Sequence, residues 1–402
     1  MNLRGNTFRP VSAAWEIVVP VDGDSSVSST CTEEPIMFPI SRRRLMGALG
    51  IGGAASVAGC TTGLETEAVG QPSTTLQEAQ KKAVDRVAAD PTDVPDPIDR
   101  NEPKHHDITL EAKEVTVEIE EGVTFNFMTF EGRIPGPMIR LRQGDTVSFT
   151  MENVPENKRP HNVDMHAIYG TGGGSVATTA QPGNANGESF TATYPGAYIY
   201  HCAVSNMDQH ISTGMFGMVL VEPKEGLPAV DREFYLGQHE LYTDKPVGKE
   251  GHHGFSLEAM MTEDSTYVVF NGEKYPFTED RYGTMSAETG ETARVFMLTG
   301  GPNVSSNFHP IGNVWSRAWR DGALAGHPEK YVQTMKVPPG SCMVGEMDFP
   351  VPERIKLVDY ALTRVARRGL LAEVDVTGPE RPEIFDPSPN KPKGTDEEGP
   401  IY

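Results

Sequence analysis

The sequence predicts an all-β protein made of two tandem Greek-key β-sandwich domains. Short runs of Val, Ile, Phe, Tyr and Thr alternate with polar residues and are interrupted by Gly and Pro, as is typical of short strands joined by turns. A weak internal repeat indicates the second domain, because Gly144-Asp-Thr-Val in the first half is echoed by Gly290-Glu-Thr-Ala in the second. The expected sandwiches span about 105–225 and 230–378.

Residues 1–60 predict an export signal and an N-terminal extension. Ser41-Arg-Arg-Arg precedes a short Gly/Ala-rich apolar stretch that ends at Cys60, a pattern typical of a twin-arginine signal and too short to span a bilayer as a helix. The residues before Cys60 resemble a lipobox, so we expect a lipid on Cys60 and an anchor on the outer face of the membrane; the alternative is an unmodified cysteine beside an ordinary cleavage site. Residues 1–36 lack signal character, so we expect translation to start at Met37.

The segments that flank the two sandwiches have biased compositions. Residues 61–104 are rich in Thr, Glu, Ala, Pro and Asp and predict a flexible tether. Residues 379–402 form a Pro-rich, acidic C-terminal tail. A net charge of -21 excludes nucleic acid as a natural partner and suits a highly saline setting. Beyond Cys60 only Cys202 and Cys342 remain, so no disulfide framework is expected, and Cys342 is expected to be buried packing.

The strongest chemical signal is a set of sulfur and imidazole side chains around the end of one predicted strand. Cys202 ends the run Tyr194-Pro-Gly-Ala-Tyr-Ile-Tyr-His-Cys, His210 follows after seven residues, and Met215 follows after four more. His161 lies upstream. A thiolate, two imidazoles and a weakly bound thioether are the ligands of a trigonal blue-copper site. A lone Cys or Met would more often be core packing, but this order and spacing predict a type 1 copper site.

A second metal site is indicated beside the first. His201 and Cys202 are neighbours on an extended strand, so their side chains point to opposite faces and can bind two metals joined by one peptide link. His161 and His166 are an odd number of residues apart and also face opposite ways. His166 and His201 can therefore give a second metal two nitrogen ligands, with Asp164 nearby as a proton carrier; the alternative for Asp164 is a turn-forming or capping residue.

These motifs resemble those of the copper-containing nitrite reductases, which are two-domain cupredoxins assembled as homotrimers. The resemblance runs through most of residues 105–378. Besides the His161-to-His166 segment and the His201-Cys202 strand, it includes Phe130-Glu-Gly-Arg-Ile-Pro-Gly-Pro-Met-Ile-Arg, the glycine loop Tyr169-Gly-Thr-Gly-Gly-Gly-Ser, and Val337-Pro-Pro-Gly-Ser. It implies cupredoxin-type sandwiches and an NO-forming nitrite reductase.

The resemblance also implies a role for each motif residue. His161, Cys202, His210 and Met215 would hold one type 1 copper per chain, and His166 and His201 would hold a type 2 copper at a subunit interface. Asp164 and His309 would orient nitrite and deliver protons, with His309 coming from the adjacent chain. A small redox protein would donate the electron, which would pass from the type 1 to the type 2 copper through Cys202-His201.

One residue departs from the family pattern. The family's third type 2 ligand is a histidine in a strand that reads Val-Asp-His-Ala-Leu, and this chain reads Leu357-Val-Asp-Tyr-Ala-Leu. A phenol with a pKa of about 10 is a far poorer ligand at neutral pH than imidazole unless the metal removes its proton. Tyr360 is as well explained as an interface aromatic that packs and hydrogen-bonds.

Three outcomes for the type 2 site are therefore open. Tyr360 binds copper as phenolate, or another histidine replaces it, or the site is impaired or empty and the protein is an electron-transfer cupredoxin with type 1 copper alone. The spare candidates are His239, His252, His253 and His327. A laccase-like multicopper oxidase is disfavoured, because its copper cluster needs His-x-His pairs and none of the 11 histidines forms one.

Overall fold

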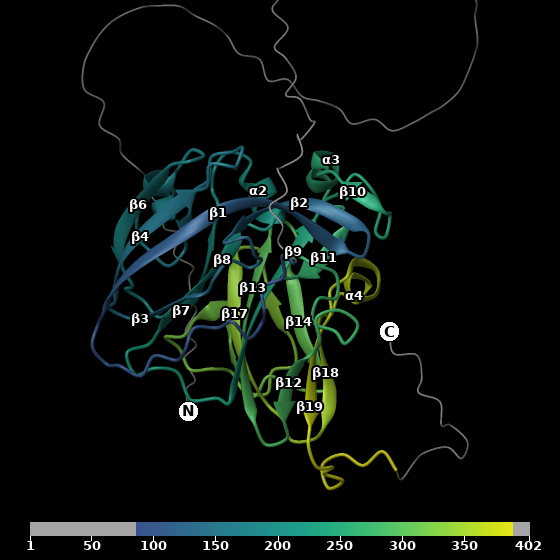
Figure 1. Ribbon diagram of the computed structural model, residues 1–402. Coiled ribbons are helices and arrows are strands. Elements are labelled where there is room, and N and C mark those ends of the chain that lie inside the picture. Colours follow the sequence, from purple (N-terminus) through teal and green to yellow (C-terminus); the bar gives the residue numbers. More distant parts are fainter. Residues whose placement is uncertain (1–85, 389–402) are drawn as a thin grey trace, which may run out of the picture. The chain divides into compact units, whose positions relative to one another are not determined.

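Strands dominate the computed structural model, which describes residues 86–388 (Figure 1). The predicted twin-arginine segment, Cys60 and the end of the acidic tail lie outside these residues. No helix among the described residues is long and apolar enough to cross a membrane. The prediction of an all-β protein is confirmed.

The first half of the chain, with the short strand β10 added from the second half, forms two sheets that enclose a core; apart from β10, these strands are drawn in blue to teal in Figure 1. One sheet has the order β10-β2-β1-β4-β6: Gly251–His253, Val123–Phe130, His105–Glu120, Thr146–Asn153 and Ala185–Thr191. The other has the order β3-β8-β7-β5: Ile139–Arg142, Phe216–Glu222, Gly196–His201 and Asp164–Met165. Their inward side chains, including Phe149 and Cys202, form one hydrophobic cluster, so the cysteine lies at the edge of a packed core.

The second half forms another pair of sheets, drawn in green to yellow in Figure 1. One has the order β11-β9-β13-β17-β15: Tyr267–Phe270, Arg232–Leu241, Thr292–Gly301, Ser341–Asp348 and Arg317–Trp319. The other has the order β12-β19-β18-β14-β16: Met285–Glu288, Ala372–Thr377, Glu353–Asp359, Ser306–Ile311 and Met335–Val337. Their core contains Phe234, Trp315 and Leu357.

The helices are short and sit in the connections between strands. They are η1 (Thr171–Gly174), α1 (Ser175–Thr178), α2 (Met207–Ser212), α3 (Leu257–Met261), η2 (Arg320–Gly322) and α4 (Thr363–Arg368). Of these, η1 and α2 carry or flank the residues predicted to be functional, so their placement matters most for the site.

A third hydrophobic cluster joins the two halves. Phe216 and Met218 from β8 pack there with Tyr235 from β9 and Phe296 from β13. Cys342 is buried in the same cluster, as expected from its alternating sequence context. The sheet that carries the His201-Cys202 strand is therefore packed on both faces, which holds the strand in place.

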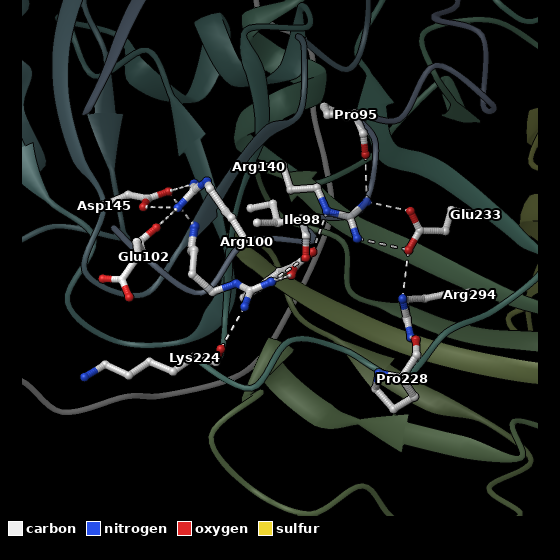
Figure 2. A network of polar contacts seen from close by, with 12 residues as sticks. Pro95, Ile98, Arg100, Glu102, Arg140, Asp145, Lys224, Pro228, Glu233 and Arg294 are labelled. Carbon is white, nitrogen blue, oxygen red and sulfur yellow. Dashed lines mark hydrogen bonds and ion pairs between the residues drawn. The ribbon is translucent and has the colours of Figure 1, made fainter. Parts of the chain in front are cut away.

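Buried ion pairs reinforce this contact (Figure 2). Glu233 on β9 accepts hydrogen bonds from Arg140 on β3, with Nη1 to Oε2 at 2.5 Å, and from Arg294 on β13, with Nη1 to Oε1 at 2.8 Å. Arg140 also donates from Nε to Glu222 Oε1 at 2.6 Å. Both arginine side chains are only 2% exposed, so removal of one partner would leave a buried charge unpaired.

Residues 86–104 pack against the strands, although we expected this part of the chain to belong to a flexible tether. Val87 is fully buried, and its N–H donates to Glu273 Oε1 at 2.9 Å. Arg140 Nη1 donates to the carbonyl of Pro95 at 2.7 Å (Figure 2). Buried side chains far along the sequence thus bind the backbone of this segment, which composition alone does not indicate.

Candidate metal centres

The residues predicted to bind type 1 copper come together where β7 ends and α2 begins. The Cys202 sulfur lies 3.4 Å from His210 Nδ1 and 3.8 Å from His161 Nδ1. A metal bound trigonally by nitrogen at about 2.0 Å and sulfur at about 2.3 Å would separate those atoms by about 3.7 Å. All three side chains are buried. The nitrogen and sulfur donors therefore fit one copper ion.

Met215 lies directly beside this set. It is fully buried, its N–H donates to the carbonyl of His210 at 3.0 Å, and its carbonyl accepts from the N–H of Cys202 at 3.1 Å. The loop from Cys202 to Met215 is therefore closed by its own backbone hydrogen bonds. The structure thus groups the donor atoms of His161, Cys202 and His210, and the backbone of the loop places Met215 next to them.

Burial shifts the pKa values of Cys202 and His210 in the folded chain. Loss of solvent raises the pKa of the Cys202 thiol to about 11, and loss of solvent together with the nearby His161 lowers the pKa of His210 to about 3. His210 thus presents a neutral imidazole. The thiol needs a bound cation to release its proton, which couples metal binding to proton release.

Two supporting residues were missed from the sequence. Glu114 on β1 lies 3.3 Å from His161 Nε2, and burial alone would raise its pKa, but hydrogen bonds from His161 and from the N–H of Lys158 lower it. Asn162 Oδ1 accepts from the N–H of Ala203 at 2.7 Å. An acceptor on Nε2 leaves Nδ1 of His161 free to face the cysteine, which orients the ligand. Glu114 is 47 residues from His161, so local spacing carries no signal for it.

The second donor set lies on the opposite face of the same strand. His166 Nε2 is 3.2 Å from His201 Nε2, close to the roughly 3.3 Å expected for two nitrogens about 2.0 Å from one tetrahedral metal. Asp164 completes a group whose ligand atoms all lie within 4.8 Å of one another. Burial lowers the pKa of His201, which favours its neutral, metal-binding form. Two imidazoles and a carboxylate therefore fit a second copper, with at least one position left for a further ligand.

The glycine loop (residues 169–175) lies directly on Asp164. A Cβ added at Gly173 would fall 1.9 Å from Asp164 Oδ1, and the φ of Gly173 is +57°. Any larger residue would therefore both clash and strain the backbone. Gly340, in the turn before β17, lies near His166, because its added Cβ would fall 3.8 Å from His166 Cε1.

His309 and Tyr360 do not join these groups. Their rings contact each other edge to face, with centroids 5.2 Å apart, and His309 Nδ1 donates to the carbonyl of Gln333 at 2.6 Å. Both rings line a cavity of about 230 Å³ whose other walls include Ile311 and Leu362. Tyr360 is 56% exposed. Within one chain, the His309–Tyr360 pair is therefore separate from the second donor set.

The spare histidines do not join either donor group of their own chain, within its described residues. His239, His252, His253 and His327 lie outside both donor groups. His239 is fully buried and directs Nδ1 to the carbonyl of Ser212 at 2.8 Å, and His253 directs Nε2 to the carbonyl of Lys249 at 2.6 Å. These two histidines serve the packing.

A surface cavity opens beside the first donor set. It has a volume of about 520 Å³ and is lined by His210 together with Arg159, Asn162, Val176 and Gln209, among others. Val176 is 69% exposed. The imidazole of His210 is therefore the part of this set that comes nearest to solvent.

Comparisons with known proteins agree with this geometry. Residues 111–226 match the multicopper oxidase family model. The chain is 41% identical to a copper-containing nitrite reductase of Neisseria meningitidis over 302 residues, 75% of this chain and 76% of that protein, and 31% identical to one of Neorhizobium galegae over 67% of this chain and 74% of that protein. The solved copper nitrite reductase of Nitrosomonas europaea aligns with a TM-score of 0.61 and 32% identity, covering 69% of this chain and 96% of that one. The chain belongs to the copper-containing nitrite reductase family.

Proposed function

We propose that this protein reduces nitrite to nitric oxide, consuming one electron and two protons and releasing water. The observation that carries the proposal is the pair His201 and Cys202, adjacent residues that contribute to two separate donor sets. Copper bound at these sets would supply one-electron redox chemistry and a Lewis acid for nitrite. The covalent link between the two residues gives the shortest path between the sets.

The residues around the second set can position the substrate and move protons. Asp164 lies within 4.8 Å of the His166 and His201 nitrogens and is covered by the glycine loop. Its carboxylate can take up a proton from solvent and pass it to an oxygen of nitrite, which leaves as water once it carries two protons. His309 would supply the second proton from a neighbouring chain.

A homotrimer would complete the site. His309 and Tyr360 lie on an exposed face with an apolar cavity, and Tyr360 and Leu362 are 56% and 43% exposed. Such a face suits burial against a second copy. A small redox protein would donate electrons at the cavity beside His210, where exposed Val176 gives an apolar contact. Because His309 would come from a neighbouring chain, dissociated monomers should be inactive.

Tyr360 supports a second candidate function. If a phenol replaces the third imidazole, the second set can be too weak to hold copper, and the chain would then only transfer electrons through the type 1 site. The test is copper content with steady-state nitrite reduction for wild type and Tyr360→His. NO formation by wild type supports the reductase; activity that appears only in Tyr360→His supports the electron-transfer protein.

We also propose that the chain is exported by the twin-arginine route and held by lipid on Cys60 at the outer face of the cell membrane. The sequence pattern around Arg42 and Cys60 supports this location. The test is fractionation of cells that express wild type or Cys60→Ser. Release of only the variant from the membrane fraction supports the anchor, and equal distribution contradicts it.

A further inference from the structure

Lys356 on β18 is a half-buried cation that the proposed mechanism does not use. It lines the cavity of about 230 Å³ that also holds His309 and Tyr360. Its side chain makes no hydrogen bond or ion pair with any residue of 86–388. The remaining walls of the cavity are aliphatic, from Ile311, Val358, Leu362, Val365, Ala366 and Leu371. An ammonium group in such a place lacks the partner that normally accompanies burial of a charge.

The register of β14 and β18 places Lys356 beside His309. His309 is the direct partner of Val358, so Lys356 and Tyr360 are its two diagonal neighbours on β18. Residues two apart on a strand share a face, and diagonal neighbours of an antiparallel pair are about 7–8 Å apart, within reach of long side chains. On one side the ring of Tyr360 already contacts that of His309. Lys356 occupies the matching position on the other side.

The nearest charged residues do not use the ammonium group of Lys356. Glu373 is its partner on β19, but no ion pair joins the two among the described residues, and Glu373 does not line the cavity. On α4, Arg364 pairs with Asp359. The positive charge of Lys356 is therefore directed to the cavity and is available to an anion.

We propose that Lys356 is an anion-binding residue whose ammonium group holds nitrite in this cavity, beside His309. The net charge of -21 repels small anions from the molecule as a whole, so a local positive charge against apolar walls is needed to concentrate nitrite near the site. The role in turnover rests on the proposed nitrite reduction. Anion binding itself does not, because it is a property of the folded chain.

The first test is NMR of the chloride ion in solutions of the full-length protein, reduced so that bound copper is diamagnetic. Chloride that exchanges with a protein site gives a broadened resonance, and nitrate, an oxyanion of the same charge as nitrite, should reverse the broadening by competition. This reversible broadening is expected in wild type and should be lost in Lys356→Gln. It should persist in Lys224→Gln, which removes the charge of an exposed lysine outside the cavity.

Two further variants separate the charge from the packing of the side chain. Lys356→Arg should retain most of the broadening, because a guanidinium group also carries a positive charge. Glu373→Gln should increase it, because the nearest carboxylate no longer opposes anion binding. Equal broadening in wild type and Lys356→Gln would overturn anion binding at Lys356.

The second test is steady-state nitrite reduction by the copper-loaded protein, in wild type and in the Tyr360→His background. Lys356→Gln should raise KM for nitrite about tenfold, since a hydrogen bond to a charged group is lost, and should leave kcat nearly unchanged. Lys356→Arg should recover most of the affinity, and Lys224→Gln should behave as wild type. Equal KM values in wild type and Lys356→Gln would overturn the role in turnover. Absence of NO from every form would overturn the proposed function, while the chloride NMR would still decide anion binding.

Discussion

Asp164 and His201 are direct partners in the antiparallel ladder between β5 and β7. Next to this pair, the N–H of His166 donates to the carbonyl of Ile199 at 3.0 Å. The two imidazoles and the carboxylate of the second set are therefore all carried by β5, β7 and the residues that directly follow β5. The proposed proton carrier is therefore positioned by backbone hydrogen bonds and not by a free loop. This is the reason why small changes near it should have large effects on activity.

Cys202→Ser should abolish the intense visible absorption of a copper–thiolate bond and remove one copper equivalent per chain. Nitrite reduction with a protein electron donor should fall at least about 100-fold, because electrons lose their entry site. Cys342→Ser is the control: that thiol is equally buried but lies in the core between the halves, so the absorption should stay. Retained absorption in Cys202→Ser would refute the type 1 assignment.

Glu114→Leu should weaken the first site without removing a ligand. Loss of the acceptor for His161 Nε2 frees that ring to turn, and loss of such supporting contacts costs about 10–100-fold in metal affinity. The measurement is copper retention in a chelator titration followed by visible absorption. Glu111→Leu, at a partly exposed position on the same strand, should behave as wild type.

Gly173→Ala should lower nitrite reduction by about 100-fold, because the added methyl group displaces Asp164 from its position. Type 1 absorption should be unchanged. Gly248→Ala is a matched control, since Gly248 also has a positive φ, +74°, but its added Cβ meets nothing within 4 Å. If both variants lose activity equally, backbone strain and not the contact with Asp164 is responsible.

Glu240 should make the protein less stable at alkaline pH. Burial raises its pKa to about 7 despite hydrogen bonds from the N–H groups of Asn303 and Val304, so the folded state binds more protons than the unfolded state between about pH 4.5 and 7. Stability therefore falls as pH rises through this range, by roughly 3 kcal/mol at most. Glu240→Gln should flatten the dependence in urea unfolding measured at about pH 5 and pH 8. The exposed Glu258→Gln should leave it intact.

Arg140→Leu should destabilise the fold by about 3–5 kcal/mol, because Glu222 and Glu233 would lose a buried partner. The measurement is urea unfolding of the copper-free protein. Arg354→Leu breaks an ion pair whose two side chains are 41% and 74% exposed, and should change stability by about 1 kcal/mol or less. Similar losses in the two variants would contradict a special role for the buried network.

The sequence contained most of the two donor sets but little of what supports them. His161, His166, His201 and Cys202 could be placed because strand alternation fixes opposite faces for neighbouring residues, and His210 and Met215 follow in one short loop. Glu114 could not, because it reaches His161 from a strand distant in sequence. The packing of residues 86–104 was missed for the same reason: buried Glu273 binds their backbone from 186 residues away.

Gly340, in the second half of the chain, lies near His166 of the second donor set, because a Cβ added at Gly340 would fall 3.8 Å from His166 Cε1. The two halves are held together by the apolar cluster between them and by the ion pairs of Glu233 with Arg140 and Arg294. These interactions oppose any hinge motion that would move Gly340 away from His166. A redox centre built at such a rigid junction changes its oxidation state with little movement of the surrounding atoms, so the barrier from structural rearrangement during electron transfer is kept low.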